Sequence, residues 1–208
     1  MNQKNVFKAL GLACAAALLS ACATTGPASS QAVSPYRDSI EVAGRLSVNY
    51  DKGGQPETLS GKFTWSQTPA AVDVALLSPL GQTIATIRVT PESATLTQSD
   101  KTPRVARDID TLTAQTLGWS LPVSGLRDWL QGYATGADGQ RFVASPASNT
   151  VTTPDGWRLT FVSWQEARAG AGAGAALAGP APKRIDAQRS ASATSGELAL
   201  RIVIDQPG

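Results

Sequence analysis

Few residue types in this chain can support catalysis. The sequence holds no histidine, which removes the commonest general base and zinc ligand together with every serine–histidine–aspartate arrangement. It also lacks a nucleophile elbow, a phosphate-binding loop and a dinucleotide-binding glycine motif. The close pair Asp108 and Asp110 lies where a helix is predicted to begin, and helix capping explains it better than paired-acid hydrolysis. The sequence therefore predicts a protein that is not an enzyme and that needs no metal ion and no cofactor.

Cys22 is the side chain whose surroundings indicate a definite reaction. It ends the lipobox Leu19-Ser20-Ala21-Cys22, in which small residues fit a signal peptidase and the thiol receives diacylglycerol. The preceding residues have the layout of a secretory signal, and their apolar run is too short to span a bilayer. We expect residues 1–21 to be removed and Cys22 to be acylated. A plain signal peptide with an incidental cysteine is the weaker alternative.

The acylated cysteine also predicts a location. Position 23 is Ala rather than Asp, and Asp there favours retention in the inner membrane of enterobacteria, so we expect an outer-membrane protein that faces the periplasm. No second long apolar segment follows, which leaves lipid as the membrane anchor. We divide the chain into a signal peptide (1–21), a lipidated flexible tether (22–38) and a single domain (39–208).

Composition narrows the class of protein further. Once Lys4 and Lys8 leave with the signal, acidic and basic residues are equal in number, so no nucleic-acid partner is predicted. Cys14 leaves as well, and the remaining chain then has no disulfide. Because 42% of the residues are hydrophobic, packing alone can form the core and apolar surface can remain. We expect a monomer.

Hydrophobic periodicity predicts an α+β domain built on a strongly curved antiparallel sheet. Helical spacing appears over 108–117 and again over 124–130. Alternating residues indicate about ten to eleven strands, near 40–50, 59–65, 72–76, 83–89, 94–98, 141–145, 149–153, 157–164, 184–188 and 197–205. The Gly/Ala-rich run near 169–179 offers no packing side chains and is interpreted as an extended loop between two strands.

Two segments invite a functional interpretation. Pro79 and Gly81 bracket Leu80 at the tip of a predicted hairpin, where water normally favours a polar side chain. Leu80 either folds back over the sheet edge or points outward, where an apolar partner can contact it. Outward display forgoes about 1.5–3 kcal/mol of burial free energy. The helical region either packs as ordinary core or covers an apolar cavity. The candidate residues for such a cavity and its cover are Leu117, Trp119, Leu126, Trp129, Leu130 and, from the sheet, Trp65.

A series of short motifs resembles the outer-membrane lipoprotein receptor family LolB. The resemblance extends from about Ile40 to Asp205. The chain differs from the family pattern at the Gly/Ala-rich insertion and at its end, where the aromatic residue expected after the last strand is missing. The motifs are Gly44-Arg45-Leu46-Ser47-Val48, Gly61-Lys62-Phe63-Thr64-Trp65-Ser66-Gln67, Leu77-Ser78-Pro79-Leu80-Gly81-Gln82-Thr83, Leu121-Pro122-Val123, Gly125-Leu126-Arg127-Asp128-Trp129-Leu130-Gln131-Gly132, Trp157 with Trp164, Pro182-Lys183-Arg184-Ile185 and Leu198-Ala199-Leu200-Arg201-Ile202-Val203-Ile204.

The resemblance implies an incomplete barrel around an apolar cavity, with two or three short helices as a lid. It implies that the protein accepts the acyl chains of other lipoproteins from the soluble periplasmic carrier LolA and releases them into outer-membrane lipid. Leu80 sits in the matching Pro-Leu-Gly turn, so the resemblance implies that it is the membrane-insertion residue. A structural or assembly lipoprotein with a filled core is the alternative.

Overall fold

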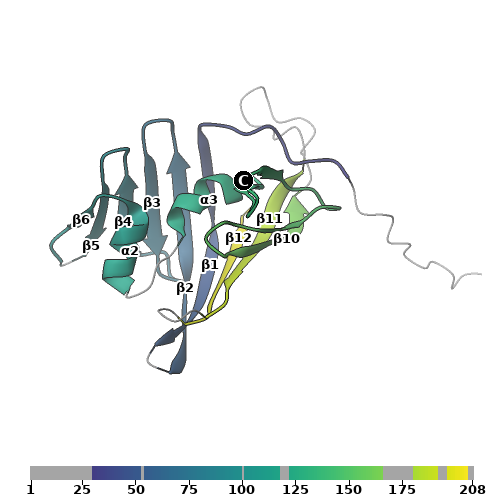
Figure 1. Cartoon of the computed structure of the whole chain (residues 1–208). Coiled ribbons are helices and arrows are strands. Elements are labelled where there is room, and N and C mark those ends of the chain that lie inside the picture. Colours follow the sequence, from purple (N-terminus) through teal and green to yellow (C-terminus); the bar gives the residue numbers. More distant parts are fainter. Residues whose placement is uncertain are drawn as a thin grey trace, which may run out of the picture.

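A ten-stranded antiparallel sheet forms the frame of the domain in the computed structural model (Figure 1). The structure describes residues 30–52, 54–99, 101–117, 122–165, 180–191 and 196–205. Cys22, Trp119 and the Gly/Ala-rich run near 169–179 lie outside these residues. The strand order is β6-β5-β4-β3-β2-β1-β12-β11-β10-β9, and all neighbouring strands are antiparallel.

The large sheet is accompanied by two short helices and a separate hairpin. Its strands are β1 (Ile40–Lys52), β2 (Gln55–Gln67), β3 (Val72–Leu77), β4 (Thr83–Val89), β5 (Ala94–Gln98), β6 (Arg104–Ala106), β9 (Thr150–Thr152), β10 (Arg158–Gln165), β11 (Ala181–Arg189) and β12 (Leu198–Ile204). The helices are α2 (Ile109–Leu117) and α3 (Val123–Trp129), and the hairpin is β7 (Tyr133–Thr135) with β8 (Arg141–Val143).

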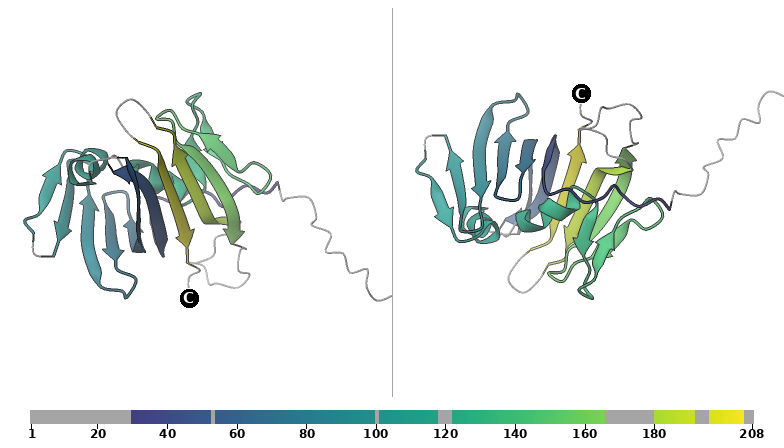
Figure 2. Two further views of the ribbon diagram at one scale, coloured as in Figure 1. Left: turned by 90° about the horizontal axis from the view of Figure 1, so that it is seen from below. Right: turned by 90° about the horizontal axis from the view of Figure 1, so that it is seen from above.

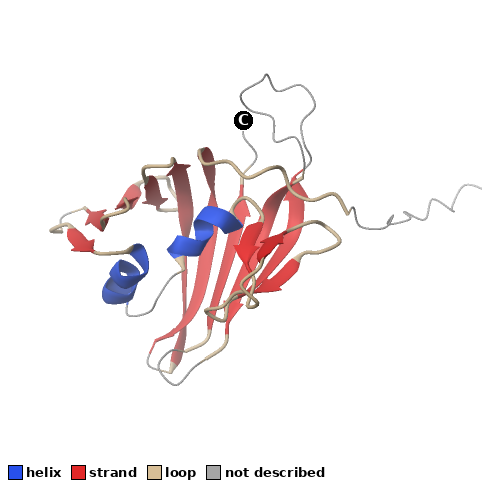
Figure 3. Cartoon of the chain, turned by 45° about the horizontal axis from the view of Figure 1, so that its top comes forward, coloured by secondary structure: helices blue, strands red, loops and turns tan. Residues whose placement is uncertain are grey.

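The sheet has one buried face because its strands alternate apolar and polar residues. In β2, Phe63 and Trp65 are buried while Thr64 between them is exposed. The same alternation recurs in β12, where Leu200 and Ile202 are buried and Arg201 is exposed. The sheet curves, and both helices lie on its inner face, as Figures 2 and 3 show. Helix α2 contacts β5 and β6, whereas α3 contacts α2 and β7.

One half of the inner face is filled by aromatic side chains. Trp157, Phe161 and Ile185 are at most 1% exposed, and the ring of Phe161 stacks on Phe142 with centroids 6.1 Å apart. The β7–β8 hairpin and the segment before β1 close this half, and the hydroxyl of Tyr133 donates a hydrogen bond of 2.7 Å to the carbonyl of Ser34. The other half, formed by β1 to β4, lies under α3.

The predicted fold class is confirmed, as a curved antiparallel sheet with two short helices. Strands β6 and β7 were not predicted from the sequence, because neither alternates buried and exposed residues, whereas β8 and β9, which are equally short, do. Helix α3 begins at Val123, one residue before the predicted start at Ser124.

Candidate functional site

A small apolar cavity lies between the inner face of the sheet and helix α3. Its volume is about 50 Å³, and every residue that lines it is aliphatic or aromatic. The helical side contributes Val123, Leu126 and Leu130. The sheet side contributes Leu46, Phe63, Trp65, Val74, Leu76, Ile87, Leu200 and Ile202, from β1, β2, β3, β4 and β12. The side chains of such a wall offer almost no hydrogen-bonding partner to a water molecule.

The one polar atom of the lining side chains is satisfied by a buried neighbour. The indole N–H of Trp65 donates to Oε1 of Gln67 at 3.2 Å. Nε2 of Gln67 in turn donates to the hydroxyl of Tyr36 at 3.2 Å, and Gln67 is only 1% exposed. Because this chain of hydrogen bonds pairs the Trp65 N–H, the aromatic ring can serve as a purely apolar wall.

The N-terminal end of α3 is held by polar contacts at the surface. Its N-cap residue, Pro122, makes no side-chain capping bond. The carboxylate of Asp110 in α2 takes this role, accepting the main-chain N–H of Ser124 at 3.3 Å and the Ser124 hydroxyl at 2.6 Å. In the last turn of the helix, Nη2 of Arg127 donates to the carbonyl of Thr68, in the turn between β2 and β3, at 3.0 Å. These contacts fix the helix over the cavity.

The C-terminal end of α3 is anchored differently, in the filled half of the domain. Trp129 is buried against Trp157, with ring centroids 6.2 Å apart. A Cβ atom at Gly125 would lie 2.7 Å from Cε2 of Trp129, so only glycine leaves room for this ring. The side-chain amide of Gln131, just after the helix, pairs with the main chain of Arg37 through bonds of 2.9 and 3.0 Å.

Helix α2 begins where the sequence predicts it. Oδ1 of Asp108 accepts the main-chain N–H of Thr111 at 2.8 Å, and Oδ2 accepts the Thr111 hydroxyl at 2.9 Å. These hydrogen bonds stabilise the ionised carboxylate and lower the pKa of Asp108 from its ordinary value. Capping therefore accounts for Asp108, as the sequence indicates.

Leu80 is displayed at the tip of a tightly hydrogen-bonded turn between β3 and β4. The carbonyl of Ser78 accepts the N–H of Gly81 at 2.9 Å, and the Ser78 hydroxyl accepts the N–H of Gln82 at 3.2 Å. Gly81 adopts a φ of +89°, which other residues rarely do. Leu80 itself is 91% exposed. Of the two orientations considered from the sequence, the structure shows the outward one.

A second apolar side chain lies beside this turn. The pairing between β3 and β4 passes from Leu76 with Ala85 to Leu77 with Thr83, so Ile84 is the extra residue of a β-bulge. Ile84 is 50% exposed. The hairpin end thus carries two exposed apolar side chains, Leu80 and Ile84.

The residues proposed from the sequence for a cavity and its cover are distributed over several places. Trp65, Leu126 and Leu130 line the cavity, whereas Trp129 is buried against Trp157 and is not part of the lining. The side chain of Leu117 lies outside the described residues, as do Trp119 and Cys22. The strand residues of the lining could have been found from their period-two pattern. The contacts of Asp110 and Arg127 with distant segments leave no such signal.

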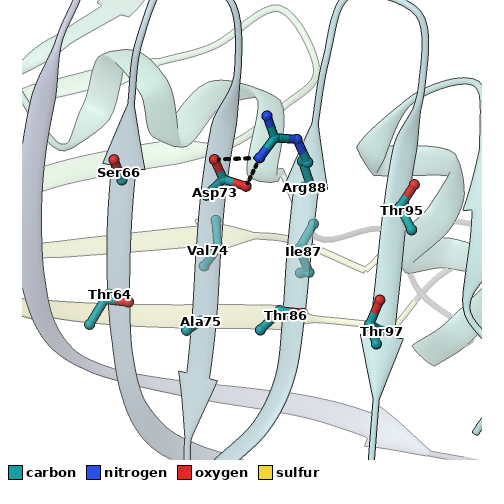
Figure 4. A pocket seen from close by; sticks show the side chains of 10 residues that line it. All are labelled: Thr64, Ser66, Asp73, Val74, Ala75, Thr86, Ile87, Arg88, Thr95 and Thr97. Carbon is teal, nitrogen blue, oxygen red and sulfur yellow. Dashed lines mark hydrogen bonds and ion pairs between the residues drawn. The ribbon is translucent and has the colours of Figure 1, made fainter.

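A more open depression occupies the outer face of the same strands (Figure 4). Its volume is about 470 Å³. Hydroxyl groups of Thr64, Thr86 and Thr95 line it, together with the ion pair between Arg88 and Asp73, whose atoms are 3.0 Å apart. Its lining mixes charged, hydroxyl and apolar groups, whereas the cavity beneath α3 is lined by apolar side chains throughout.

Comparison with known proteins agrees with these features. Residues 38–206 match the family model described as "Outer membrane lipoprotein LolB". An outer-membrane lipoprotein LolB of Cupriavidus taiwanensis is 39% identical over 90% of each chain. One of Cupriavidus pinatubonensis is 38% identical over 99% of this chain and 98% of the relative.

Among solved structures, a LolA superfamily protein of Nitrosomonas europaea superposes with a TM-score of 0.40 at 5% identity, covering 82% of this chain and 86% of that chain. That likeness is too weak to carry an argument about function. No helix within the described residues is long and apolar enough to cross a membrane. The match over nearly the whole domain and the identity to the curated relatives are sufficient by themselves: the chain belongs to the LolB family of outer-membrane lipoproteins.

Proposed function

We propose that this lipoprotein accepts the acyl chains of other lipoproteins from the soluble carrier LolA and inserts them into the outer membrane. Acylated Cys22 anchors it there, and the domain faces the periplasm. The observation that carries the proposal is the wholly apolar inner face of the sheet beneath α3. Each acyl methylene removed from water contributes about 0.8 kcal/mol, so a protein that carries acyl chains needs such a surface.

The cavity must enlarge before it can hold cargo. A volume of about 50 Å³ is well below the roughly 300–1,000 Å³ of pockets that enclose organic ligands. Helix α3 is the movable wall, because three of the lining side chains belong to it or directly follow it. When its N-terminal end moves away, an acyl chain takes the place of Val123 and Leu126 against the sheet.

The two ends of α3 suit this movement. Opening the N-terminal end breaks the exposed hydrogen bonds between Ser124 and Asp110, whose polar groups then bond to water, so the net cost is small. Opening the C-terminal end would expose Trp129, which is only 3% exposed and packs on Trp157. The helix therefore turns about its Trp129 end.

Leu80 acts at the second stage, release into the membrane. Its display in water forgoes about 1.5–3 kcal/mol, which it regains when the turn enters the hydrocarbon of the bilayer. Entry of the turn brings the cavity close to the lipid that receives the cargo. Transfer from LolA to this protein and on to the bilayer then runs towards increasing affinity, without a nucleotide.

Transfer from LolA tests the proposal. The mature chain with Cys22→Ala is mixed with LolA that carries a lipoprotein, and acceptance is followed by co-purification and by displacement of a fluorescent fatty-acyl compound. We expect acceptance by this chain and its loss in Leu126→Arg, which places a charge in the cavity wall. Leu59→Arg is the matched control, because Leu59 is 46% exposed and does not line the cavity. Normal acceptance by Leu126→Arg would refute the proposed cavity.

A structural lipoprotein with a filled core is the second candidate, and the small volume of the cavity favours it. The same assay separates the two functions. If the chain neither binds the fatty-acyl compound nor accepts cargo, with its fold intact by circular dichroism, the structural function is supported.

A further inference from the structure

A groove on the outer face of the sheet carries an excess of positive charge next to the Leu80 turn. It measures about 400 Å³ and crosses strands β2, β1 and β12. Its charged lining residues are Arg45, Lys62 and Arg201, and Pro79 of the turn closes one side. Arg45 points outward because its neighbour Leu46 lines the inner cavity.

Two of these cations face each other directly. Arg45 on β1 pairs in register with Lys62 on β2, and like charges in such a position destabilise a sheet. Lys62 makes no ion pair with any described residue. Arg45 has Asp205 at 3.6 Å, a separation at which two exposed groups gain little. The arrangement is unfavourable in the isolated protein and becomes favourable when an anion binds.

The third cation is also only partly neutralised. Nε of Arg201 lies 3.4 Å from Oδ1 of Asp186. That carboxylate is already bound by Arg184, through hydrogen bonds of 3.0 and 2.6 Å. This part of the outer face therefore holds two carboxylates, Asp186 and Asp205, and four cations, and its net charge is positive. The cations are Arg45, Lys62, Arg184 and Arg201.

The position of the groove indicates what binds there. Pro79 lines the groove and immediately precedes Leu80, and Lys62 pairs in register with Leu77 at the base of the same hairpin. A surface that Leu80 enters must therefore meet these cations as well. Leu80 is apolar and the groove is cationic, and a bilayer with anionic headgroups complements both. An acidic protein segment would complement the groove alone.

We propose that Arg45, Lys62 and Arg201 bind the phosphate groups of anionic phospholipids in the membrane that Leu80 enters. This inference rests on the proposed function, since it takes the Leu80 turn to insert into lipid. The cations fix the orientation of the domain on the bilayer, while Leu80 supplies the apolar contact. Each cation near an anionic surface strengthens binding by roughly fivefold, and salt weakens the effect.

Vesicle binding tests the groove without involving the carrier. The mature chain with Cys22→Ala, so that no acyl chain holds it, is floated with vesicles of phosphatidylcholine alone or mixed with phosphatidylglycerol. We expect tighter binding to the anionic vesicles, with Lys62→Gln lowering that affinity by roughly fivefold and the Arg45→Gln, Lys62→Gln, Arg201→Gln triple variant abolishing the preference. The control is Arg158→Gln, an exposed cation three strands away from β1, which should change little.

Three outcomes would overturn the inference: equal binding to both vesicles, equal losses from Arg158→Gln and Lys62→Gln, or binding of inorganic phosphate without any binding of vesicles. Its failure can be told apart from failure of the proposed function. If Leu80→Glu abolishes lipoprotein insertion while the groove variants bind anionic vesicles normally, only the groove is refuted. If the unmodified chain accepts no lipoprotein from LolA, the proposed function itself fails.

Discussion

The hydroxyl of Ser124 at the start of α3 lies 2.6 Å from Oδ2 of Asp110 in α2, and it donates a hydrogen bond across the two helices. Asp110 lies fourteen positions earlier in the chain, yet it caps a helix that has no cap of its own. This contact couples the two helices on the inner face of the sheet. Whatever loosens it should ease the opening of the cavity.

Ser124→Ala should therefore speed the entry of a fatty-acyl compound several-fold. The variant removes a hydrogen bond to a carboxylate at the end of α3 that must move, and leaves the cavity wall unchanged. Stopped-flow fluorescence measures the rate. Thr58→Ala is the matched control, since it removes an exposed hydrogen bond of 2.8 Å to Asn49 on the β1–β2 hairpin, away from the helices. Equal rates in the two variants would show that this contact does not limit opening.

Leu126→Ala and Trp129→Ala should have different consequences although the two residues are close in sequence. Leu126 is half-buried in the cavity wall, so its truncation should cost about 2 kcal/mol of stability and increase affinity for an acyl compound by enlarging the cavity. Trp129 is buried against Trp157, and its truncation should cost about 3–5 kcal/mol. Urea unfolding and fluorescence titration measure the two quantities. Equal losses of stability would contradict the proposed division of α3 into a movable and a fixed end.

Leu80→Glu should lower insertion of cargo into the membrane by about tenfold or more and leave acceptance from LolA intact. A charged side chain cannot regain the burial energy that Leu80 gains in lipid. Ile84→Glu should act in the same direction and more weakly, because Ile84 is already half-buried. Val105→Glu is the control, at an apolar residue that is 63% exposed on β6. A liposome insertion assay distinguishes them, and normal insertion by Leu80→Glu would make Leu80 a turn residue only.

Helix α2 should become less stable in acid because of Asp108. Hydrogen bonds from Thr111 lower the pKa of Asp108 below its ordinary value of 3.8. The carboxylate therefore stabilises the folded chain above its unfolded pKa, and this stabilisation is lost as the pH falls through the lowered folded value. Amide hydrogen exchange in α2 at decreasing pH measures the effect. Asp108→Asn retains a capping oxygen and should remove this part of the pH dependence; an unchanged profile would contradict the assignment.

What the sequence determined by itself is local. Alternation in segments such as 59–65 placed Phe63 and Trp65 on one face, and Asp108 marked the start of a helix, because pleating and capping depend on residues a few positions apart. The same reasoning identified the Pro-Leu-Gly turn at Leu80. Strands β6 and β7 were missed, since they are defined by their pairing partners rather than by an alternating pattern of their own.

The tertiary structure decided which apolar residues surround the cavity and which fill the core. Leu126 and Trp129 lie on the same short helix and have similar hydrophobic character, yet one lines the cavity while the other packs on Trp157. The capping of α3 by Asp110 and the charged groove of Arg45, Lys62 and Arg201 arise in the same way. Each depends on contacts between segments far apart in the chain, which only the folded arrangement of the strands and helices brings together.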